Sequence, residues 1–172
     1  MKKLLFLAIT LLIFSCSTTQ TTGGSSSTST KISKKNLKGT WEITNIKFVG
    51  DKGLYKANLF DIADSPCFNG SKWVFIPNNG SGKFTLIDGN RCDGSSHRIH
   101  WSLYEPGDGT YQFQFKFVND KNKPLDAANR GFRTNIDHLD TNAMVMRVNT
   151  SYEGSSFDVV LTFSKVSEDF SL

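Results

Sequence analysis

Apolar side chains at every second position in two segments constrain the fold more than any other feature of the sequence. In residues 111–117 four aromatic side chains have this spacing, with polar residues between them, and in residues 157–163 four apolar side chains have the same spacing. The aromatic residues of the first segment are Tyr111, Phe113, Phe115 and Phe117. A period of two residues is typical of a β-strand that buries one face and leaves the other in water.

This aromatic stripe has two interpretations. Aromatic side chains contribute much of the buried area of a protein core, so the stripe first predicts core packing. The same side chains are also candidate ligand-lining residues, because a small barrel can use its inner surface for both purposes.

Turn-forming residue pairs divide the chain into eight expected strands. Pairs of Asn or Asp followed by Gly, at residues 69–70, 79–80, 88–89 and 93–94, are typical of hairpin turns. The expected strands are residues 40–49, 72–76, 83–87, 98–104, 110–118, 132–139, 143–149 and 157–166. Eight short strands predict an all-β barrel or sandwich. Residues 54–63 lack the alternation, and their apolar spacing predicts a short helix or an ordered loop after the first strand.

The N-terminus has the order of a secretory signal. Lys2 and Lys3 precede a short apolar stretch, and Ser15 and Cys16 follow it. The segment Ile13-Phe14-Ser15-Cys16 resembles the lipobox of bacterial lipoproteins. We therefore expect a signal peptide over residues 1–15 and a lipid-modified Cys16 that anchors the protein in the bacterial cell envelope. Ser17, with no acidic residue close behind, resembles the signal for the outer membrane.

The segment after Cys16 is predicted to be a tether. Residues 17–30 contain only Ser, Thr, Gln and Gly, which cannot bury enough apolar surface to offset their chain entropy. The expected organisation is a lipidated cysteine and flexible tether over residues 16–36, followed by one folded domain over residues 37–172. The formal net charge of the chain is +4. Its basic residues are scattered along the sequence, which argues against a nucleic-acid partner.

The two remaining cysteines, Cys67 and Cys92, form an even pair in an oxidising compartment. This pairing favours a disulfide. Two free thiols are the simplest alternative, and a metal site is a third, although two cysteines without a neighbouring CxxC pair are a weak zinc signal.

Residues Gly39-Thr40-Trp41, at the start of the first expected strand, resemble the G-x-W signature of the lipocalin superfamily. The chain is also similar to small lipocalin-like lipoproteins of bacteria, which show a cysteine, a W-x-F strand, a Gly-containing turn and a second cysteine. Here these are Cys67, Trp73-Val74-Phe75, the turn at 80–82 and Cys92. The T-D-Y motif of better-known lipocalins is missing.

The resemblance implies an eight-stranded antiparallel up-and-down barrel. It also implies that Gly39 and Trp41 close one end of the barrel beneath a basic side chain. Lys165, near the end of the last expected strand, is the first candidate for that cation, and Arg147 is the second.

No residue grouping predicts catalysis, a metal or a cofactor. His97 and His100 are three residues apart, so on a strand their side chains point to opposite faces. No G-x-S-x-G nucleophile motif is present. We expect a monomeric binding protein rather than an enzyme.

Two functions remain open at this stage. The first is a barrel that holds a small apolar ligand. The second is a filled barrel that acts through its loops as a protein-interaction or inhibitor module, which the abundance of phenylalanine, 14 residues in this chain, favours.

Overall fold

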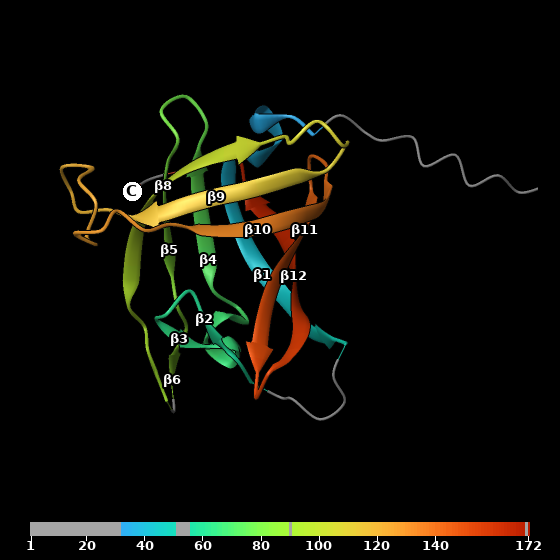
Figure 1. Cartoon of the computed structure of the whole chain (residues 1–172). Coiled ribbons are helices and arrows are strands. Elements are labelled where there is room, and N and C mark those ends of the chain that lie inside the picture. The colour runs from blue at the N-terminus through green and yellow to red at the C-terminus, as the bar shows by residue number, and fades with distance from the viewer. Residues whose placement is uncertain (1–31, 51–55, 90, 171) are drawn as a thin grey trace, which may run out of the picture.

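Eight antiparallel strands form a closed barrel in this computed structural model, which describes residues 32–50, 56–89, 91–170 and 172 (Figure 1). The barrel strands are β1 (Gly39–Val49), β4 (Lys72–Ile76), β5 (Ser81–Thr85), β8 (Ser96–Tyr104), β9 (Tyr111–Phe117), β10 (Phe132–Leu139), β11 (Ala143–Tyr152) and β12 (Ser155–Ser167). The predicted signal peptide, Cys16 and most of the tether lie outside the described residues.

The strand order has the up-and-down topology that the resemblance implied. The order around the barrel is β1-β12-β11-β10-β9-β8-β5-β4, and β4 pairs again with β1 to close it. Every barrel strand pairs antiparallel with its neighbours, from Gly39 to Ser167. The closed sheet therefore needs no residue before Gly39. Among the described residues, no helix has the length and apolar character needed to cross a bilayer.

One end of the barrel is closed around Trp41. The 3-10 helix η1 (Lys34–Leu37) covers this end, and the Trp41 indole Nε1 donates a hydrogen bond to the Leu37 carbonyl oxygen at 2.9 Å. The Lys165 ammonium lies 5.0 Å from the centre of the fully buried Trp41 ring. Gly39 has a φ of +111°, and a Cβ there would collide with the Ser167 carbonyl oxygen. The second candidate, Arg147, instead forms ion pairs on the outer surface.

The opposite end carries the connections after β1 and β5. The first contains the short strands β2 (Asn58–Leu59) and β3 (Ala63–Asp64) and the 3-10 helix η2 (Ser65–Phe68). The second contains the hairpin β6 (Asp88–Gly89) and β7 (Cys92–Asp93). Of the two predicted possibilities for the segment after the first strand, the described part is an ordered loop built on a β-hairpin. Figure 1 places these elements at one end of the barrel and η1 at the other.

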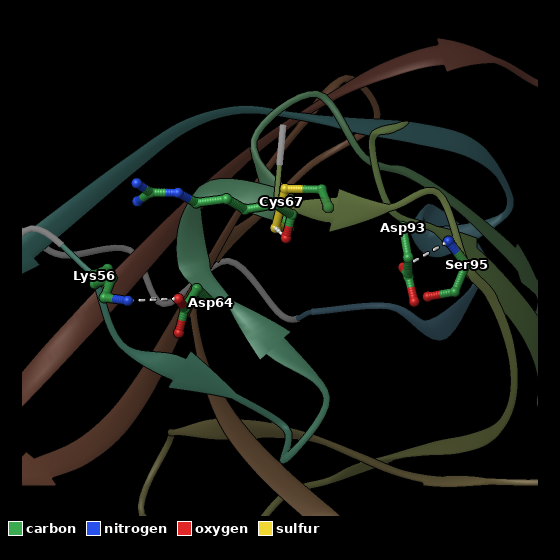
Figure 2. Close-up of a disulfide and its surroundings, with 7 residues drawn as sticks. Lys56, Asp64, Cys67, Asp93 and Ser95 are labelled. Carbon is green, nitrogen blue, oxygen red and sulfur yellow. Dashed lines mark hydrogen bonds and ion pairs between the residues drawn. A yellow bond between two sulfur atoms is a disulfide. The ribbon is translucent and has the colours of Figure 1, made fainter. Parts of the chain in front are cut away.

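A disulfide joins these two connections. The Cys67 and Cys92 sulfur atoms are bonded, with the Cα atoms 5.5 Å apart, which confirms the predicted pairing. Figure 2 shows this bond beside the Lys56–Asp64 ion pair, whose atoms are 2.9 Å apart. The backbone NH of Ile87 also donates to the Cys67 carbonyl oxygen at 3.2 Å. The two connections are thus held together both covalently and by a hydrogen bond.

Aromatic rings fill the middle of the barrel. Trp73 on β4 stacks on Phe84 of β5 with ring centres 4.1 Å apart. Trp73 also makes edge contacts with Phe115 of β9 at 6.3 Å and Phe163 of β12 at 5.8 Å. These rings come from strands on different sides of the barrel, so side chains occupy much of the space that a ligand cavity would need.

Candidate functional site

The largest hollow described in the structure lies at the open end of the barrel, beside the β2–β3 hairpin. Its volume is about 680 Å³. Three segments form it: the tip of the hairpin, the barrel strands beneath, and the long connection between β9 and β10. The lining residues are Phe60, Asp61, Ile62, His97, Phe117, Leu125, Asp126, Ala127, Arg130, Gly131 and Phe132.

Phe60 forms one wall and also plugs the barrel below it. Its backbone is left-handed, with a φ of 56°, and that of Asp61 is similar, at 60°. This turn directs the Phe60 ring inward, where it is 6% exposed. The ring makes edge contacts with Phe115 at 5.0 Å and Phe132 at 5.6 Å. The cavity therefore ends on an aromatic floor and does not continue into the barrel interior.

Charged groups lie on the rim. The Arg130 Nε is 2.6 Å from a carboxylate oxygen of Asp126. This bond raises the pKa of the Arg130 guanidinium above its ordinary value, and the negative charge of Asp61 adds to the effect. The same bond, together with one from the Ala128 backbone NH, lowers the pKa of Asp126. The rim thus keeps its charges over the whole physiological pH range.

His97 supplies a neutral polar group near the aromatic wall. Its ring centre lies 5.5 Å from that of Phe117, and its Nε2 is within 2.8 Å of the Ser95 hydroxyl. Burial lowers the pKa of His97, because the charged imidazolium loses water, while Asp93 opposes this shift only in part. At neutral pH His97 therefore presents an uncharged ring to the cavity.

The structure separates the four residues of the predicted aromatic stripe. Phe113 and Phe115 are buried in the core, at 0% and 3% exposure, and Tyr111 is half-buried. Phe117 alone of the four lines the cavity at the open end. The other aromatic members of the wall, Phe60 and Phe132, were not predicted as site residues. Phe60 lies in a segment without alternation, so no periodic signal could have identified it.

The residues considered for other chemistry lie apart from one another. His97 points towards the aromatic core and His100 lies exposed on the outer surface, as expected for positions three apart on a strand. Arg147 is held between Asp137 at 2.5 Å and Asp158 at 3.1 Å. Within the described part of the chain, no group of three or more His, Cys, Asp or Glu side chains is placed to hold a metal ion.

Comparison with known families agrees with this geometry. The lipocalin-like domain family matches residues 37–146, from the end of η1 into β11. The chain belongs to the lipocalin-like family. Lipocalin-like proteins are generally binding proteins rather than enzymes, and they typically bind small hydrophobic molecules. A search of curated proteins finds none that matches the chain.

Proposed function

We propose that this lipocalin-like protein is a lipid-anchored component of the bacterial cell envelope that binds a small, mostly apolar ligand at the open end of its barrel. The observation that carries the proposal is the cavity of about 680 Å³ walled by Phe60, Phe117 and Phe132. Ligand sites are concave, mainly apolar and supplied with a few polar groups, and they commonly measure about 300–1,000 Å³. The cavity meets each of these criteria.

The position of the polar groups indicates how such a ligand would lie. Its apolar part packs against the phenylalanine wall and the side chains of Ile62 and Leu125. Leu125 is 64% exposed, so covering it with a ligand removes apolar surface from water. A polar end of the ligand points to the rim. There Asp61 offers a hydrogen-bond acceptor, Arg130 offers hydrogen-bond donors, and His97 offers a neutral imidazole.

The envelope location rests on the sequence of the first 30 residues. A signal sequence ending at Cys16, followed by a polar tether, supports a lipid anchor in the outer membrane. The tether joins the barrel at η1, at the closed end, whereas the β2–β3 hairpin that lines the cavity lies at the opposite end (Figure 1). This arrangement leaves the cavity open to the aqueous phase when the chain is anchored.

A neutral fluorescent probe, N-phenyl-1-naphthylamine, tests the ligand site. The protein used is residues 17–172, which retain every barrel strand. Ala127 lines the cavity and Ala128 does not, although both are exposed. We expect the wild type and Ala128→Trp to bind the probe alike. Ala127→Trp should weaken binding about tenfold or more, because the indole occupies the cavity. Equal binding by both variants would place the probe elsewhere and contradict the proposal.

A second function, an interaction module that acts through its loops, is favoured by one observation. Aromatic rings from β4, β9 and β12 meet across the barrel interior, which leaves the protein without a deep calyx between them. If no member of a panel of neutral apolar compounds binds the wild-type chain or raises its Tm, this second function is the better account.

A further inference from the structure

The outer surface of one half of the barrel carries more basic than acidic residues. Strands β4, β5, β8 and β9, all fully described, contain four basic residues and no Asp or Glu. The next strand, β10, adds Arg133 near its start. We call this surface the basic face. Its charged members are Lys72, Lys83, Arg98, Lys116 and Arg133, and the exposed His100 lies among them.

The strand register places like charges side by side on this face. Lys83 is directly opposite Arg98 across β5 and β8. Like charges at directly opposite positions destabilise a sheet. Such an arrangement costs folding free energy unless other groups neutralise the charge.

The protein itself compensates this charge only in part. Arg98 pairs with Asp120 at 2.7 Å, but the Asp120 side chain is 88% exposed, and exposed ion pairs contribute little. Lys116 donates to the Asn129 side-chain oxygen at 2.9 Å, which carries no charge. Lys72 is directly opposite Glu42 of β1, and Asp169 lines a neighbouring hollow that also contains Lys72 and Lys83.

The other half of the barrel shows the opposite arrangement. There Arg147 of β11 lies between Asp137 of β10 and Asp158 of β12, and both carboxylates contact its guanidinium. Acidic and basic side chains balance on that side, so the excess positive charge is a property of one face.

A shallow hollow of about 390 Å³ lies on the part of the basic face that β8, β9 and β10 form. Side chains of β8, β9 and β10 surround it, and no carboxylate is among the described residues that line it. The polar lining residues are His100, Ser102, Gln114, Lys116 and Arg133. These side chains supply several hydrogen-bond donors and two permanent positive charges, a combination that suits an oxyanion such as a phosphate group.

We propose that the basic face docks on the anionic phospholipid surface of the membrane that holds the lipid anchor. This inference rests on the proposed envelope location. η1, where the tether joins the barrel, contacts β8 from the inner side at the closed end, because the Lys34 ammonium lies 5.0 Å from the centre of the buried Trp101 ring. The exposed Lys35 and Lys38 extend the positive charge to this end.

The predicted tether also brings the face within reach of a membrane. A flexible chain of the length of residues 16–33 has an average end-to-end distance of about 23 Å. Strand β8 is about 30 Å long at the usual rise per residue. The barrel can therefore lie on its side on the bilayer, and the tether holds the basic face close to the headgroups.

Vesicle binding by residues 17–172 without lipid modification tests the proposal. The two vesicle types are pure phosphatidylcholine and a mixture with phosphatidylglycerol. We expect binding to the anionic vesicles only, and loss of binding at high salt, because exposed charges are screened within a few ångströms there. The test variant is Lys116→Gln/Arg133→Gln. Its matched control is Lys47→Gln/Lys56→Gln, which removes the same charge from exposed positions outside the face.

The test variant should bind anionic vesicles about 25-fold more weakly, since each basic residue near an anionic surface contributes about fivefold. The control should bind like the wild type. Equal weakening of both pairs would mean that net charge alone attracts the protein, and this overturns the proposal. Binding to dextran sulfate but to neither vesicle also overturns it, in favour of an anionic polymer. Neither result affects binding of the neutral apolar probe, so the two proposals fail separately.

Discussion

Trp41 and Phe60 fill the two ends of the barrel by different means. Trp41 lies in a regular strand, and its position after Gly39 in a G-x-W pattern allowed its role to be expected. Phe60 has a left-handed backbone, with a φ of 56°, which costs a non-glycine residue about 1–2 kcal/mol. Burial of its ring against Phe115 and Phe132 offsets that cost. Tertiary packing therefore determines this turn, and local sequence preference does not reveal it.

Trp41→Ala should lower the free energy of unfolding by about 3–5 kcal/mol, the usual cost of truncating a fully buried aromatic side chain. The change also leaves the Leu37 carbonyl oxygen without its indole donor and Lys165 without the ring beneath it. Denaturant unfolding of residues 17–172, followed by circular dichroism, measures the difference.

Lys47→Ala, an exposed change on the same strand, serves as the control and should stay within about 0.5 kcal/mol of the wild type. A cost below about 1 kcal/mol for Trp41→Ala would show that this side chain does not close the barrel.

At the scale of the elements, alternation and turn chemistry located all eight barrel strands. The β4 and β10 boundaries, residues 72–76 and 132–139, agree with the expected ones. β5 differs: residues 83–87 were expected, but the strand is Ser81–Thr85. Ser81 and Gly82 pair with both β4 and β8, whereas Leu86 and Ile87 bond to Ser95 and Cys67 outside the barrel ladder. Residues 86–87 were expected to belong to the strand because they are apolar. In the structure they instead pack against the disulfide-linked connections.

The Cys67–Cys92 bond stabilises the open end through these connections. The cysteines are 25 residues apart, so in the chain-entropy treatment the bond contributes about 3.5 kcal/mol. The double variant Cys67→Ala/Cys92→Ala should lose about that amount in denaturant unfolding. A reducing agent should destabilise the wild type similarly and leave the double variant unchanged. An equal effect of the reducing agent on both proteins would contradict this prediction.

At the scale of the whole molecule, the closed barrel brings together residues that the sequence keeps apart. Basic residues that are scattered along the chain meet on one outer face, because β5, β8, β9 and β10 are neighbours in a fixed register. The cavity at the open end likewise combines the β2–β3 hairpin with the connection between β9 and β10. Alternation identifies which residues point inward, but it does not give the register between strands or the path of long loops. Neither the basic face nor the cavity could therefore be predicted from the sequence.

The lipid anchor is also tested at this scale. Of the three cysteines in the chain, Cys67 and Cys92 are bonded to each other, so Cys16 is the residue left to carry a lipid. We expect Cys16→Ser to abolish metabolic labelling with a fatty acid and to move the protein out of the membrane fraction or leave its signal peptide uncleaved. One acyl chain binds a membrane only marginally and two or more anchor it stably, so the loss of the modification site should be visible in fractionation. Ser17→Ala, next to the predicted modification site, should keep both the label and the membrane fraction. Fatty-acid labelling of the Cys16→Ser protein would disprove the anchor.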